Sequence, residues 1–117
     1  MGKAPYKDLI AWQKADLLAK EVYKCTKSFP KEELFGVTSQ LRRAALSVPL
    51  NIVEGYARQG EKERKNFINI ALGSLAETDY LINFSFDLHF LLKVDFDVLT
   101  SLREEVGKLL WCYYQSL

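Results

Sequence analysis

Polar side chains recur every three or four residues between positions 40 and 58, in a stretch whose other positions are largely apolar. The six members of this polar stripe are Gln40, Arg43, Ser47, Asn51, Glu54 and Arg58. On an α-helix, where residues advance by about 100°, they share an arc of roughly 80° and lie on one face. Apolar stripes flank the arc, which predicts partial burial, and buried charges must pair. We interpret the polar stripe as a structural network of ion pairs and hydrogen bonds, with contact to a ligand or to nucleic acid as the alternative.

Residue types that catalysis or metal binding would need are scarce. The chain has one histidine, His89, and Phe86 rather than a glutamate precedes it by three residues, so the Glu-x-x-His pairs of di-iron bundles are missing. A single histidine also weakens any Ser/His or Cys/His nucleophile. Cys25 and Cys112 show no CxxC spacing and fall on or near apolar stripes, where thiols are usually inert. The sequence therefore predicts a nonenzymatic protein without metal or cofactor.

Nucleic-acid binding requires several cations that converge on one surface. The whole chain is nearly neutral, with 16 basic and 15 acidic residues, so such a surface must be local. Residues 1–60 carry 10 basic and 6 acidic side chains, whereas residues 61–117 carry 6 and 9. One candidate cluster surrounds the junction of the second and third predicted helices, and a second set follows the first helix. The candidates are Arg42, Arg58, Lys62, Arg64 and Lys65, and then Lys20, Lys24, Lys27 and Lys31.

Four helices must position these residues. Apolar periodicity and turn signals predict helices over about residues 8–28, 31–58, 61–92 and 96–116, with Pro30 at the start of the second and Asp95 as the N-cap of the fourth. Four helices with short connections fold most simply as an antiparallel up-and-down bundle. We therefore expect one all-α domain over residues 1–117. Pro49 lies inside the second helix and should kink it.

A second apolar stripe on the helix over residues 31–58 faces away from the core stripe. A helix that is apolar on two sides is normally buried on two sides. Two apolar residues of the first helix, two turns apart, also project away from its core stripe. These residues predict a homo-oligomer whose interface contains Ile10, Leu17, Phe35, Leu46, Leu50 and Val53. The alternative is a surface helix with scattered apolar residues, which are common on monomers.

No apolar run reaches the 18 or more residues of a membrane span. The first five residues lack the apolar stretch of a signal peptide, and Gly2 is not followed by the pattern for myristoylation. We expect a soluble, cytoplasmic protein without a membrane partner.

The segment SQLRRAALSVPLNIVEG, residues 39–55, resembles the bacterial 23S rRNA intervening-sequence protein family, also called the S23 family. The resemblance extends over about residues 6–92. Its other positions are Leu9, Trp12, Ala15, Phe29-Pro30, Glu33, Arg58, Phe67, Ala71, Gly73-Ser74-Leu75 and Glu77.

This resemblance implies an antiparallel four-helix bundle that assembles into a ring, a pentamer, and associates with RNA. Some such genes lie inside intervening sequences of large-subunit rRNA genes, and distant relatives are accessory proteins of retroelement reverse transcriptases. The characteristic positions correspond to Gln40, Arg42, Arg43, Ser47, Pro49, Asn51, Glu54, Gly55 and Arg58. Leu50 and Val53 replace smaller residues of the family pattern, which favours a protein interface over an RNA surface at that stripe.

Two functions from different classes remain open. One is a homo-oligomer that binds RNA or DNA through basic residues of the first two helices, which the family context favours. The other is a homo-oligomeric scaffold whose partner is a protein. Salt separates the two, because phosphate binding weakens steeply with ionic strength whereas apolar docking does not.

Overall fold

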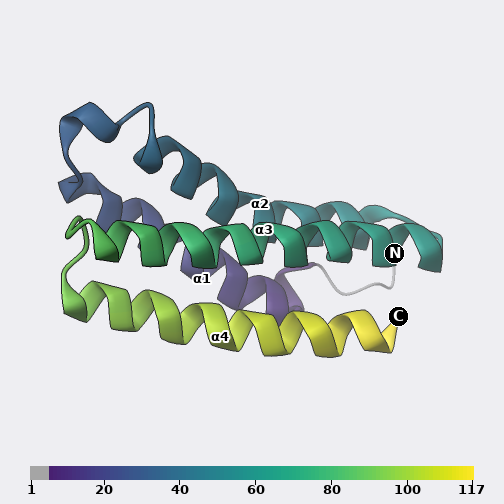
Figure 1. The fold of residues 1–117 in the computed structure, drawn as a ribbon. Coiled ribbons are helices and arrows are strands. Elements are labelled where there is room, and N and C mark those ends of the chain that lie inside the picture. Colours follow the sequence, from purple (N-terminus) through teal and green to yellow (C-terminus); the bar gives the residue numbers. More distant parts are fainter. Residues whose placement is uncertain (1–5) are drawn as a thin grey trace.

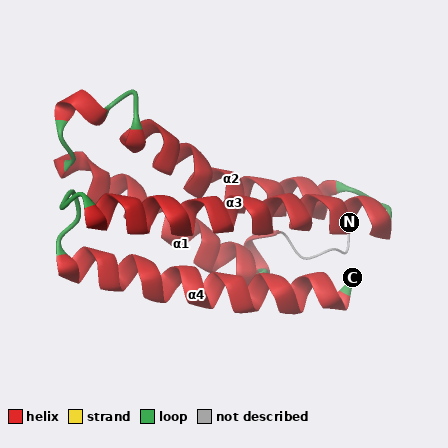
Figure 2. Cartoon of the chain, viewed as in Figure 1, coloured by secondary structure: helices red, strands yellow, loops and turns green. Residues whose placement is uncertain are grey.

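The computed structural model describes residues 6–117, and every regular element in that range is helical (Figure 2). Four α-helices and three short 3-10 turns follow one another along the chain. The α-helices are α1 (Ile10–Cys25), α2 (Val37–Ala57), α3 (Glu61–Asp87) and α4 (Lys93–Ser116), and the 3-10 turns are Tyr6–Asp8, Thr26–Ser28 and Lys31–Glu33.

The four helices form an elongated bundle of 45 × 24 × 21 Å. Each helix packs against two others, in the pairs α1 with α2, α2 with α3, α3 with α4 and α4 with α1. Figure 1 shows that the α1–α2 connection and the α2–α3 turn lie at opposite ends of the bundle. Residues far apart along α2 therefore serve different ends of the molecule.

The core consists of the apolar stripes of all four helices. Leu18, Leu41, Ile68 and Leu99, one from each helix, are completely buried. Gly55 allows α2 to approach α3 closely, since a Cβ atom at this position would lie 3.2 Å from the Cβ of Phe67.

Helix α2 begins six residues later than the sequence predicts. Residues 31–33 form a 3-10 turn, and the chain then bends through Gly36 before α2 starts at Val37. The Glu33 carbonyl accepts the N–H of Gly36, and the Glu33 carboxylate lies 3.4 Å from the N of Val37. This local turn satisfies backbone groups that a continuous helix would otherwise use. Pro49 lies inside α2, and a kink there stays a prediction.

The boundary between α3 and α4 also differs from the prediction. Helix α3 ends at Asp87 rather than near residue 92, because the N–H of Phe90 bonds the Ser85 carbonyl and the N–H of His89 bonds the Phe86 carbonyl. This pair of hydrogen bonds is a Schellman motif, and His89 takes the left-handed conformation it requires, with φ 64°. Helix α4 then starts at Lys93, so Asp95 lies in its first turn and is not the N-cap.

Among residues 6–117, no helix combines the length and apolar character needed to cross a bilayer. The predicted absence of a leader or lipid signal at residues 1–5 falls outside the described residues.

Candidate nucleic-acid interface

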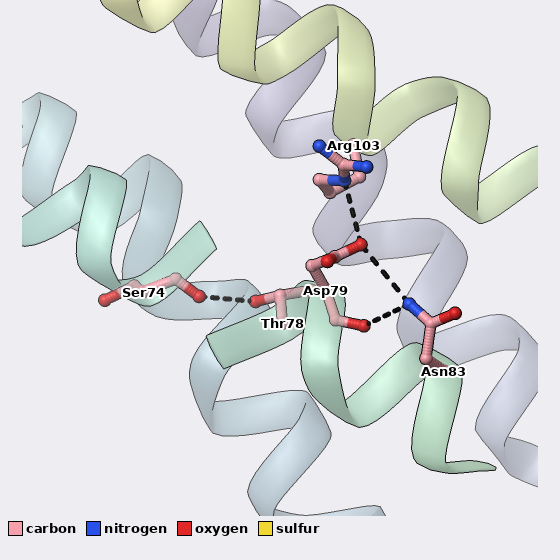
Figure 3. Close-up of polar contacts among 5 residues, drawn as sticks. All are labelled: Ser74, Thr78, Asp79, Asn83 and Arg103. Carbon is pink, nitrogen blue, oxygen red and sulfur yellow. Dashed lines mark hydrogen bonds and ion pairs between the residues drawn. The ribbon is translucent and has the colours of Figure 1, made fainter. Parts of the chain in front are cut away.

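The centre of the polar stripe joins α2 to α3. The Ser47 and Ser74 hydroxyl oxygens lie 2.8 Å apart, and Asn51 donates to the carbonyl oxygen and hydroxyl oxygen of Ser47 at 2.8 and 2.9 Å. Thr78 donates to the Ser74 carbonyl at 2.8 Å (Figure 3). These short polar side chains are half-buried or buried, and hydrogen bonds satisfy their polar atoms between and within the two helices.

Helix α3 also contacts α4, through the residue that follows Thr78. Asp79 forms an ion pair with Arg103, whose Nε lies 3.0 Å from Oδ1, and Asn83 donates to the Asp79 carbonyl at 2.8 Å (Figure 3). The sequence did not reveal this pair, because its partners lie 24 positions apart and only the fold brings them together.

The remaining members of the polar stripe do not join one network. Glu54 pairs with Arg58 at 3.0 Å, and the Arg58 guanidinium also lies over the Phe67 ring at 4.9 Å. Gln40 and Arg43 are exposed in a groove of about 590 Å³ whose other lining residues include Phe35 and Glu77. Arg43 has no ion-pair partner among the described residues, so the expected pairing of Arg43 is wrong. Exposure explains the difference, because a solvated guanidinium needs no partner.

The basic residues divide differently from the predicted clusters. Arg42 and Arg58 lie at opposite ends of α2, about 24 Å apart at 1.5 Å per residue. Arg42 therefore does not belong with Lys62, Arg64 and Lys65, and the predicted grouping of these residues is wrong. It faces the connection between α1 and α2 instead, where Lys27 and Lys31 lie.

Two lysines of the predicted α1 set are already paired. Lys20 lies 2.8 Å from Asp16, and Lys24 lies 3.7 Å from Glu21. Both lysine side chains are more than 70% exposed, so these pairs contribute little to stability but reduce the local positive charge.

Lys27, Lys31 and Arg42 line one pocket of about 430 Å³, which we call the α1–α2 corner. No carboxylate lines this pocket, and within residues 6–117 none of the three cations forms an ion pair. Arg42 is held in place, because its Nε donates to the Thr26 hydroxyl at 2.8 Å and its guanidinium lies 5.0 Å from the centre of the Tyr23 ring. A fixed arginine beside two free lysines is suited to phosphate oxygens.

The other end of the bundle carries a more mixed set of charges. Arg64 donates from Nε to the Arg58 carbonyl at 2.7 Å, and the Lys65 ammonium lies 5.7 Å from the centre of the Tyr114 ring. Lys62 and Lys65 share their pocket with Glu63. The acidic neighbour makes this end a weaker anion site than the α1–α2 corner.

A family model for the 23S rRNA-intervening sequence protein matches residues 7–112 of the chain. The chain belongs to this family. A crystal structure of a protein of unknown function from the S23 ribosomal protein family of Bacteroides thetaiotaomicron has the same fold, with a TM-score of 0.84. Its sequence is 24% identical to this chain, and the match covers 93% of this chain and 98% of that one. No curated protein matches the chain.

The positions at which this chain resembles the 23S rRNA-intervening sequence protein family lie at both ends and in the middle of α2. Ser47 and Asn51 hold α2 to α3, Gly55 permits their close approach, and Arg42 points into the α1–α2 corner. Much of the family pattern is therefore explained by packing, whereas Arg42 presents its charge to a pocket.

The predicted interface residues lie on more than one surface. Leu17 lines a groove between α1 and α4 with Val98 and Leu102, and Ile10 is two turns earlier on the same face of α1. We call this surface the α1–α4 groove. Ile10 is 56% exposed and Leu17 is 41% exposed.

The α2 patch, formed by Leu46, Leu50 and Val53, lies elsewhere. Helical spacing puts it on the side of α2 that carries Arg42 and turns toward α1. Leu46 and Leu50 are 45% and 57% exposed. Phe35, which is 93% exposed, lies apart from both surfaces, before the start of α2. Five of the six residues are thus exposed and Val53 is half-buried, and the six lie on separate faces and do not form one contiguous patch.

Cys25, Cys112 and His89 are the residues that the sequence analysis considered for nucleophilic chemistry. Burial raises the pKa of the Cys25 thiol to about 11, and the nearby Asp95 carboxylate contributes to this rise, so the thiol stays protonated at neutral pH. Cys112 is exposed on α4, and His89 occupies the exposed turn that ends α3.

Proposed function

We propose that the protein is a nonenzymatic homo-oligomer that associates with RNA or another nucleic acid through the α1–α2 corner, repeated around a ring. One observation carries this proposal: Lys27, Lys31 and Arg42 converge on one pocket without a carboxylate among its lining residues. Three cations in one place can replace counterions along a phosphate backbone, and the release of those counterions favours binding.

The two separate apolar surfaces support the ring. In a contact between different surfaces of neighbouring copies, the α2 patch of one subunit docks on the α1–α4 groove of the next. Such contacts close into a ring when the rotation between copies allows it. We take the ring to be a pentamer, as the family resemblance implies.

Assembly into a ring would raise the affinity of the α1–α2 corner for a polyanion. Cyclic symmetry places every copy of the α1–α2 corner on the same face of the ring. One polyanion can then contact several corners at once, which raises the overall affinity without any new contact.

Removing the three corner cations should weaken RNA binding much more than removing two paired lysines. We expect the variant Lys27→Ala, Lys31→Ala, Arg42→Ala to bind a labelled structured RNA about tenfold more weakly or worse, with a shallower salt dependence. Fluorescence anisotropy over a salt series measures both quantities.

The matched control is Lys20→Ala with Lys24→Ala, because these lysines are basic and exposed but pair with Asp16 and Glu21. Equal losses in the two variants would contradict the assignment to the corner. A protein that binds no RNA at low salt would favour the scaffold with a protein partner instead.

A further inference from the structure

A buried hydroxyl without a partner lies at the α1–α2 corner. Thr38, the second residue of α2, lines the pocket and is only 2% exposed. Its Oγ1 has no hydrogen-bond partner among the described residues. A buried hydroxyl without a partner is costly, so a ligand oxygen that accepts a hydrogen bond from it would satisfy an unpaired donor.

The surroundings of Thr38 favour an anion over a neutral group. Lys27, Lys31 and Arg42 line the same pocket, and α2, a helix of 21 residues, begins next to it without a side-chain cap from Gly36. The positive end of the helix dipole adds to the three cations. One carboxylate works against them, because Glu33 lies 3.4 Å from the Val37 N, although it does not line the pocket.

The Arg42 side chain is already in place for such a ligand. Its Nε donates to the Thr26 hydroxyl, which itself donates to the Val22 carbonyl at the end of α1, each at 2.8 Å. Tyr23 covers one face of the guanidinium at 5.0 Å. These contacts occupy Nε and one face, and they leave the terminal N–H groups for an oxyanion.

We propose that this pocket is a discrete oxyanion site that seats one phosphoryl group, with the Thr38 hydroxyl as a donor beside Lys27, Lys31 and Arg42. The identity of the phosphoryl group as part of a nucleic acid rests on the proposed function. The site itself rests on the pocket, its cations and the unpartnered hydroxyl. A merely basic surface would not need Thr38.

The test removes the hydroxyl and keeps every charge. Thr38→Val should melt no lower than the wild type, since it deletes a buried group without a partner, yet bind RNA about tenfold more weakly. Thr38→Ser should keep the affinity. Thr100→Val is the matched control, because Thr100 Oγ1 on α4 is also buried and unpartnered but lines no basic pocket. It should bind as the wild type does.

Three probes identify the source of the phosphoryl group: an RNA with a 5′-phosphate, the same RNA with a 5′-hydroxyl, and inorganic phosphate. A preference for the 5′-phosphate that disappears in Thr38→Val supports the site and assigns it to a strand end. Equal binding of both RNAs, with an equal loss in Thr38→Val, supports the site and assigns it to an internal phosphate.

The failures of the two proposals can be distinguished. If Thr38→Val binds both RNAs and inorganic phosphate as the wild type does, the oxyanion site is wrong and the proposed function stands. If neither RNA binds but inorganic phosphate shifts the amide resonance of Thr38 in the wild type and not that of Thr100, the site stands and the nucleic-acid function is wrong.

Discussion

Replacing Leu50 with glutamate should reduce the solution mass of the protein to that of a 13.5 kDa monomer while its helicity is retained. Leu50 lies at the centre of the α2 patch and is 57% exposed in the isolated chain. Burying a leucine fully stabilises a contact by about 1.5–3 kcal/mol, whereas burying an unpaired carboxylate costs several kcal/mol. The exchange therefore acts twice against the interface, and light scattering with circular dichroism measures the result.

The fold should tolerate this change. Leucine and glutamate have similar helix propensities, and the new like-charge pair with Glu54, four residues on, costs only a few tenths of a kcal/mol. Leu92→Glu is the control, because Leu92 is 70% exposed but lies outside both proposed contact surfaces. An assembly that survives Leu50→Glu and breaks in Leu92→Glu would move the interface to the end of the bundle where α3 meets α4.

Gly55→Val should destabilise the folded protein by about 3 kcal/mol, at the upper end of the usual cost of overpacking. A Cβ at Gly55 would lie 3.2 Å from the Phe67 Cβ and 3.3 Å from the Arg64 carbonyl oxygen. Both atoms belong to or adjoin the α3 backbone, so neither can move without separating the helices. Denaturant unfolding at one fixed protein concentration measures the change, because the apparent stability of an oligomer depends on concentration.

Gly73→Ala provides the opposite case within the same bundle. Gly73 lies inside α3 and is exposed, and a Cβ added there would have no neighbouring atom within 4 Å. Alanine should stabilise this helix by about 1 kcal/mol through its higher helix propensity. If both glycine variants shifted stability in the same direction, close packing of α2 against α3 would not be the reason for Gly55.

The all-α fold and most of the core followed from the sequence, because helical periodicity is a local signal. Ala15, Leu18, Val48 and Ile52 recur at helical spacing in the sequence and are buried. The errors occur where a helix stops. Leu34 and Leu92 lie within the helices predicted over residues 31–58 and 61–92, but the structure places them at the breaks before α2 and α4, where both are exposed. The Schellman motif at the end of α3 contains no glycine from which it could have been predicted, since His89 takes the left-handed position.

The site was harder to predict because it depends on which helix ends meet. The sequence identified Arg42, Lys27 and Lys31 as basic candidates but placed Arg42 with the residues at the far end of α2. Nothing local showed that Arg42 would contact Thr26, since the two are 16 positions apart. Thr38 was not among the predicted site residues, because a threonine near a helix start is common and only the structure shows its hydroxyl without a partner.

The most direct test of the proposed ring and of its binding to nucleic acid is the light-scattering mass of the purified protein. The mass is measured at low and high salt, with and without structured RNA. We expect a mass of five times 13.5 kDa that increases with RNA at low salt and returns to its original value at high salt. A 13.5 kDa monomer whose mass is unchanged by RNA at low salt would contradict both the ring and its nucleic-acid function.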